Sequence, residues 1–107
     1  MAHDTEDHSR LLLEINSKIK TVNKEVIDPM IPELTVDDLT PVIRLVAQIR
    51  GAYLKELFDI SSKSEGIPSH EQIKRLRELR IAYEEFVGAA QAMETAIERG
   101  YLEVEEK

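Results

Sequence analysis

The sequence predicts an all-α fold, an up-down-up bundle of three long helices that is completed by dimerisation. Three stretches of the chain place apolar residues three and four positions apart, which is the spacing of one helix face. Proline, glycine and helix-capping residues lie at the boundaries between these stretches. We therefore expect helices over residues 5–28, 41–62 and 70–99, the third being the longest. They form one domain over 1–107, with flexible ends at 1–4 and 103–107.

The first helix is expected to begin near Thr5, where Glu6 and Asp7 fall in a first turn that favours acidic side chains. Pro29 ends it near Asp28, because the residue before a proline is driven out of the helical region. Five of its apolar residues, spaced three, four, three and four apart, form one stripe: Leu12, Ile15, Ile19, Val22 and Val26.

The connector from Met30 to Thr40 is apolar enough to pack against the helices, although it contains Pro32. A single helical turn over Val36–Leu39 is compatible with its sequence. The second helix then begins with Thr40 as the N-cap and Pro41 at the first helical position.

The second helix is apolar over most of its circumference and so needs cover on more than one side. We interpret the excess as a homodimer interface, since a large exposed apolar patch usually marks an interaction site. The candidate interface residues are Ile43, Val46, Arg50, Tyr53, Leu54 and Leu57. Arg50 is the exception on this face. Its guanidinium can reach the bundle surface, pair with a carboxylate or anchor a ligand.

The third helix has a clear beginning and end in the sequence. Ser69 and Gln72 form a capping box, and Gly100 is a stop signal. Three apolar triplets seven residues apart make its seam: Leu79, Ala82, Tyr83, Phe86, Ala89, Ala90, Met93, Ala96 and Ile97. At roughly 45 Å, against roughly 33 to 36 Å for the other two, this helix should overhang its partners.

A basic cluster opens the third helix, with acidic residues among and after it. We interpret it as a solvated face crossed by salt bridges, with weak anion binding as the alternative. The cluster consists of Lys74, Arg75, Arg77 and Arg80. A net charge of −7 and a pI near 5.0 argue against nucleic-acid binding.

The remaining composition gives no indication of chemistry. The chain has no cysteine, its histidines lack metal-ligand spacing, and no serine lies in a nucleophile motif. We expect no cofactor, no metal and no catalytic residue. No apolar run is long enough for a membrane helix, and the acidic start does not resemble a signal peptide, so we expect a soluble cytoplasmic protein.

These features predict a small helical interaction or scaffold protein that forms a homodimer and binds a partner protein. The alternative is a Mg²⁺-dependent nucleotide phosphohydrolase, because two carboxylate pairs have the spacing that can hold a divalent cation. The pairs are Glu25 with Asp28 and Glu56 with Asp59.

Overall fold

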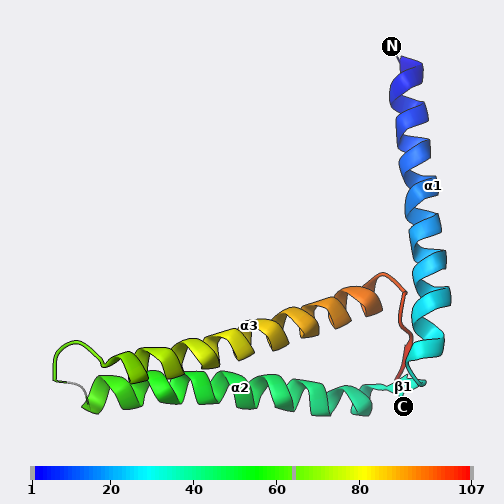
Figure 1. Ribbon diagram of the computed structural model, residues 1–107. Coiled ribbons are helices and arrows are strands. Elements are labelled where there is room, and N and C mark those ends of the chain that lie inside the picture. The colour runs from blue at the N-terminus through cyan, green and yellow to red at the C-terminus, as the bar shows by residue number, and fades with distance from the viewer. Residues whose placement is uncertain (1, 64, 107) are drawn as a thin grey trace. The chain divides into compact units, whose positions relative to one another are not determined.

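The computed structural model describes residues 2–63 and 65–106, and it confirms the all-α class. Within those ranges the chain forms three α-helices: α1 (Ala2–Ile27), α2 (Val36–Lys63) and α3 (His70–Glu98) (Figure 1). A 3-10 turn, η1, covers Asp28–Met30, and two short strands, β1 (Leu34–Thr35) and β2 (Val104–Glu105), complete the order of elements. Met1 and Lys107, which the sequence analysis placed in flexible ends, lie outside the described residues.

The chain divides into two compact units. Unit 1 contains the residues up to Val36 together with those from Met93 onward, and unit 2 is Asp37–Ala92. Unit 2 holds most of α2 and α3, whereas unit 1 holds α1, both strands and the end of α3.

The start of α2 differs from the prediction. The helix begins at Val36 and not at Pro41, so the connector turn expected over Val36–Leu39 is its first turn. Thr35, just before the helix, is a preferred N-cap type, and the acidic Asp37 and Asp38 suit the first turn. Pro41 consequently lies inside the helix, where its missing N–H removes one backbone hydrogen bond.

This earlier start also removes most of the predicted overhang. The helix α2 has 28 residues and α3 has 29, so both are about 42 to 44 Å long. The third helix is still the longest, but by a single residue.

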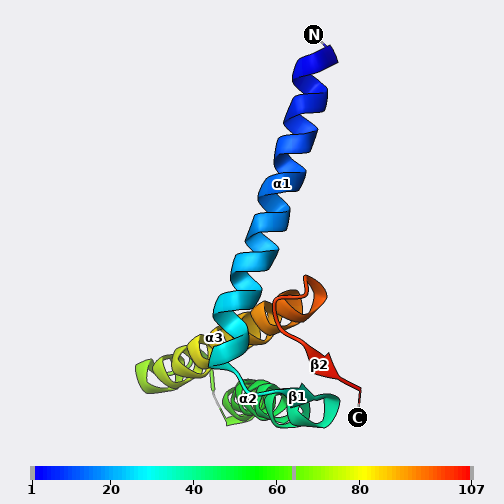
Figure 2. The ribbon, with the colours of Figure 1, turned by 90° about the vertical axis from the view of Figure 1, so that its right-hand side faces the viewer.

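In unit 2, α2 and α3 run antiparallel and side by side (Figures 1 and 2). The partially covered residues of α2 repeat at intervals of three and four, the pattern of a coiled-coil seam. We call this the first seam of α2: Leu39, Val42, Val46, Ile49, Tyr53, Glu56 and Ile60. Val46 and Ile60 are its buried members. On α3 the facing residues are Gln72, Leu76, Leu79, Tyr83, Val87 and Ala90.

Most of the predicted α3 seam lies on this covered side, with two exceptions. Phe86 and Ala89 are exposed, whereas Leu76 and Val87, which the triplet pattern omitted, are half-buried. The predicted triplets repeat strictly every seven residues. Because an α-helix has 3.6 residues per turn, such a repeat drifts around the helix, and the covered residues instead include two successive steps of four, from Leu79 to Tyr83 to Val87.

The end of α3 is the predicted glycine stop. Gly100 has φ +77°, its N–H donates to the carbonyl of Ile97, and the N–H of Tyr101 donates to the carbonyl of Ala96. This pair of bonds is a Schellman motif, which satisfies carbonyls that the helix leaves unpaired. The capping box at the other end also forms: Ser69 N–H donates to Gln72 Oε1, and Gln72 N–H donates to Ser69 Oγ.

The segment after Gly100 is paired in unit 1, where the sequence suggested a flexible tail. Strand β2 runs parallel to β1, with Leu34 opposite Val104 and Thr35 opposite Glu105 (Figure 2). Leu102 is buried, and Lys24 on α1 forms an ion pair with Glu103. The reversal at Gly100 and the burial of Leu102 explain why this acidic segment is held.

Within unit 1, the predicted stripe of α1 is exposed. Its five residues, Leu12, Ile15, Ile19, Val22 and Val26, have exposed fractions of 43–55%. Over the described ranges, no helix has a stretch long and apolar enough to cross a lipid bilayer.

Candidate interaction surface

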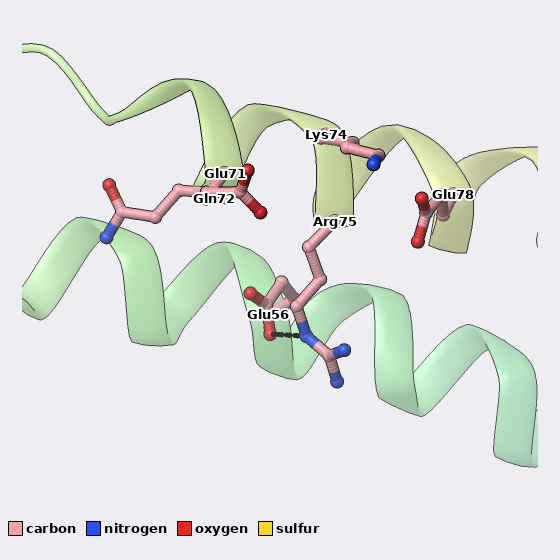
Figure 3. Close-up of a pocket in the computed structure, with 6 residues that line it drawn as sticks. All are labelled: Glu56, Glu71, Gln72, Lys74, Arg75 and Glu78. Atoms are coloured by element: carbon pink, nitrogen blue, oxygen red, sulfur yellow. Dashed lines mark hydrogen bonds and ion pairs between the residues drawn. The ribbon is translucent and has the colours of Figure 1, made fainter.

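The two sides of the α2–α3 seam are marked by different contacts. On one side Arg75 Nε donates to Glu56 Oε2 at 3.2 Å (Figure 3). On the other side the guanidinium of Arg50 lies over the ring of Tyr83, 5.7 Å from its centroid. Glu56 and Arg50 therefore mark the two opposite edges of the contact between α2 and α3, and the exposed residues of α2 can be assigned to one edge or the other.

The Arg50 side of α2 carries a second line of residues spaced four, three, four and three apart. It is the first seam displaced by one residue, and we call it the second seam: Ile43, Ala47, Arg50, Leu54 and Leu57. All five are exposed in unit 2, Ile43 at 64%, Leu54 at 46% and Leu57 at 49% among them. A helix with two adjacent heptad seams has the sequence to pack against two helices.

The structure distributes the six predicted interface residues between the two seams. Val46 is buried and Tyr53 half-buried on the first seam, facing α3. The other four, Ile43, Arg50, Leu54 and Leu57, lie on the exposed second seam. The prediction did not include Ala47. Ala47 is recognised as part of the second seam only when the structure shows which residues of α2 belong to the first seam.

Arg50 is held at the border between the seams. Its contact with Tyr83 is a cation–π interaction, and Tyr83 in turn stacks at 5.7 Å and 32° against Tyr53 of the first seam. The guanidinium therefore rests on an aromatic side chain of α3, and Arg50 as a residue is exposed on the second seam.

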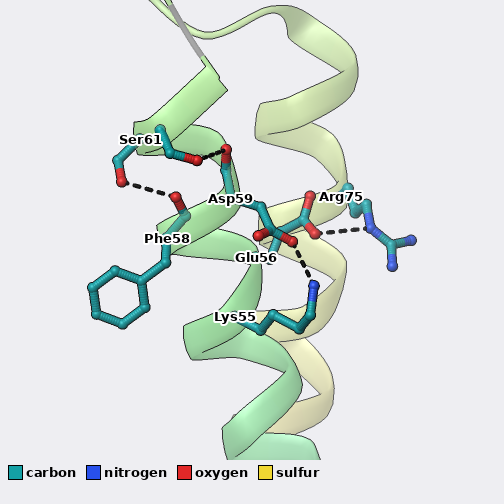
Figure 4. A network of polar contacts seen from close by, with 7 residues as sticks. Lys55, Glu56, Phe58, Asp59, Ser61 and Arg75 are labelled. Carbon is teal, nitrogen blue, oxygen red and sulfur yellow. Dashed lines mark hydrogen bonds and ion pairs between the residues drawn. The ribbon is translucent and has the colours of Figure 1, made fainter.

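Phe58 adds to the apolar surface of α2 beyond the second seam. It is 67% exposed, and its ring projects away from α3 (Figure 4). The exposed apolar surface of unit 2 thus continues around α2 from Leu54 and Leu57.

Two of the four residues in the basic cluster have carboxylate partners. Arg75 pairs with Glu56, and Arg80 pairs with Glu84 at 3.1 Å. Lys74 lines a shallow pocket together with Arg75, beside the carboxylates of Glu71 and Glu78 (Figure 3). Such exposed pairs contribute little stability, but they neutralise part of the positive charge. Anion binding at this cluster stays a prediction.

The carboxylates proposed for Mg²⁺ binding on α2 already accept hydrogen bonds from basic side chains. Lys55 Nζ donates to Asp59 Oδ2 at 2.8 Å, and Arg75 donates to Glu56 (Figure 4). The Lys55 hydrogen bond holds the pKa of Asp59 below its ordinary value, and the same bond raises the pKa of Lys55. Glu25 and Asp28 belong to unit 1. In the described part of the chain, no group of three His, Cys, Asp or Glu side chains is placed to hold a metal ion.

Comparison of this chain with known protein families, with curated proteins and with solved structures found no match.

Proposed function

We propose that this protein is a small helical interaction protein that self-associates through the second seam of α2. The observation that supports this is the exposure of a complete heptad seam beside the one that α3 covers. A second copy that brings the same seam forms a contact with twofold symmetry, in which every apolar residue is used twice. The product is a bundle of at least four helices built from two α2–α3 pairs.

Burial of apolar side chains drives this association. Complete burial of a leucine or isoleucine side chain is worth about 1.5 to 3 kcal/mol, and Ile43, Leu54 and Leu57 retain roughly half or more of their exposure in unit 2. Several partly exposed residues from each copy can therefore contribute to the free energy of association. This contribution must exceed the cost of the translational and rotational freedom that is lost on binding.

Arg50 determines how the two copies can meet. A guanidinium enclosed without a partner is strongly unfavourable, so the contact must leave its charged end at the rim or supply a carboxylate. Because the Arg50 head rests on Tyr83, its stem can pack among Ala47 and Leu54 while the charge remains hydrated. Arg50 thus favours one register of the two helices over others.

Binding of a partner protein, in the cytoplasm, is the second part of this proposal. Apolar surface outside the second seam, including Phe58, supports it because large exposed side chains commonly mark protein contacts.

The test is the effect of Leu54→Glu on molecular mass, measured by sedimentation equilibrium across micromolar concentrations. We expect the wild-type chain to associate and the variant to associate at least about tenfold more weakly, because a carboxylate at the centre of the seam must be desolvated. Gln48→Glu is the matched control, since it introduces the same residue on the polar side of α2.

A wild-type chain that stays monomeric over the whole range contradicts the proposal. So does a Leu54→Glu variant whose mass matches that of the wild type at every concentration. Circular dichroism of each variant checks that the helices remain intact.

A further inference from the structure

Within unit 1 the apolar stripe of α1 is exposed, although the C-terminal segment lies against another side of the same helix. The C-terminal segment packs beside α1 through the Lys24–Glu103 ion pair and through Lys20, whose Cε would lie 3.0 Å from a Cβ added at Gly100. Ile19, Val22 and Val26 nevertheless keep exposed fractions of 43–55%. The C-terminal segment therefore borders the stripe at Ile19 but leaves about half of each side chain exposed.

The charges beside the stripe differ between its two sides. Asn16 and Asn23 lie on the side nearer the C-terminal segment, where Asn16 and the stripe residue Ile19 line a pocket together with Arg99 and Tyr101. Lys18 and Glu25 lie on the opposite side of the stripe, seven residues apart. One side thus presents neutral amides and the other presents one positive and one negative charge.

We infer that α1 pairs in antiparallel orientation with α1 of a second copy, in the register that places Lys18 against Glu25. In a contact with twofold symmetry, Lys18 of each copy faces Glu25 of the other copy. One lysine and one glutamate per chain therefore form two ion pairs. The same register stacks Ile15 on Val26 and Ile19 on Val22, each twice, as a continuous apolar core.

Other arrangements of the two helices lack this match. An antiparallel pair displaced by one heptad brings Lys18 against Lys18 of the second copy, which is repulsive. A parallel pair places Lys18 beside Asn23 and forms no ion pair across the contact. The charges flanking the stripe therefore favour a single orientation and a single register.

This contact extends the proposed self-association to a second surface and does not depend on the α2 seam. The two surfaces belong to different units. A chain with both contacts can assemble beyond a dimer, and a chain with one contact removed is still able to form a dimer through the other.

Charge reversal tests the contact in the Leu54→Glu background, where the α2 seam is disabled. Lys18→Glu or Glu25→Lys alone creates two repulsive pairs, and we expect each to weaken association by about tenfold in sedimentation equilibrium. An equimolar mixture of the two variants restores opposite charges at both positions and should associate like the Leu54→Glu parent. Glu14→Lys, on the outer side of α1, is the control and should leave the mass unchanged.

The inference is overturned if the single reversals leave the mass unchanged or if mixing them fails to restore association. It is also overturned if the Leu54→Glu parent is already monomeric throughout, a result that leaves the α2 proposal intact. In the converse outcome, the charge reversals weaken association but Leu54→Glu by itself does not. That outcome supports the α1 contact and contradicts the α2 proposal.

Disulfide trapping tests the orientation, because the natural chain has no cysteine. Ile15→Cys and Val26→Cys chains should form a cross-link when mixed under mild oxidation, and neither should do so alone. Cross-linking within each variant alone indicates a parallel pair and overturns the proposed register.

Discussion

Among single residues, two glycines have opposite roles in α3 and its end. Gly100 has φ +77°, a conformation that is costly for any residue with a Cβ, and its added Cβ would lie 3.0 Å from Lys20 Cε. Gly88 lies inside α3, and a Cβ added there would meet nothing within 4 Å. The first glycine is required by the turn, whereas the second only weakens the helix.

Substitution of alanine at these two positions should therefore change stability in opposite directions. Gly100→Ala should lower the free energy of unfolding by about 1 to 2 kcal/mol, because it forces a left-handed residue at the helix end. Gly88→Ala should raise it by about 0.5 to 1 kcal/mol through higher helix propensity. Urea denaturation followed by circular dichroism measures both. A shift of the same sign for the two variants contradicts this account.

Among the elements, α2 is distinguished by its two adjacent seams. Val46 and Ile60 on the first seam are buried against α3, and the second seam carries the exposed Ile43, Leu54 and Leu57. A strictly amphipathic helix would show one such line and a polar remainder. The second line is why we assign α2, and not α3, the principal role in association.

The C-terminal segment is joined to α1 by the Lys24–Glu103 ion pair, and the contribution of this pair to stability should depend on pH. The hydrogen bond from Lys24, together with the attraction between the two charges, lowers the pKa of Glu103 below its ordinary value of 4.5 and raises that of Lys24 above 10.5. The stabilisation from Glu103 is complete above pH 4.5 and is lost as the pH falls through its lowered pKa. The stabilisation from Lys24 is complete below pH 10.5 and is lost as the pH rises through its raised pKa.

An NMR titration of the Glu103 carboxyl carbon measures this coupling. We expect a pKa below 4.5 in the wild-type chain and a return toward 4.5 in Lys24→Met. Lys20→Met removes a lysine one helical turn earlier on α1 without removing the hydrogen bond, so it should shift the Glu103 pKa less. Equal effects of the two substitutions would show that general positive charge, and not the Lys24 contact, sets the pKa.

At the scale of the whole molecule, the small number of side chains buried within each unit links folding to association. Within the two units, and over residues 5–63 and 65–106, the buried apolar residues are Val46, Ile60 and Leu102, while many large apolar side chains of the three helices are exposed in the unit to which they belong. A small domain normally needs a larger core or an additional source of stability. Oligomerisation is the source that the exposed seams can provide.

The midpoint temperature of unfolding should consequently rise with protein concentration, because association stabilises only the folded chain. Calorimetry over an approximately 100-fold concentration range measures this effect. The dependence should weaken in a chain that combines Leu54→Glu with Lys18→Glu. An unfolding temperature that is the same at every concentration would contradict the coupling of folding to association.

The sequence alone predicted the helical class, the number of helices and the ends of α3. These features depend on neighbouring residues: Ser69 with Gln72, and Gly100 with the turn before it, act within a few positions of the chain. The start of α2 was predicted wrongly because two capping signals compete there. Thr40–Pro41 is a good local start, but the helix begins after Thr35, beside the β1–β2 pair.

The division of α2 into a covered seam and an exposed seam was decided by the tertiary structure. Periodicity indicated that α2 is apolar over most of its circumference, but it could not show which line of residues α3 would cover. The pairing of β2 with β1 was also hidden, because strand pairing joins residues about 70 positions apart and leaves little trace in a two-residue strand. Local spacing determines which elements form, whereas contacts between distant residues determine which of their faces remain exposed for binding.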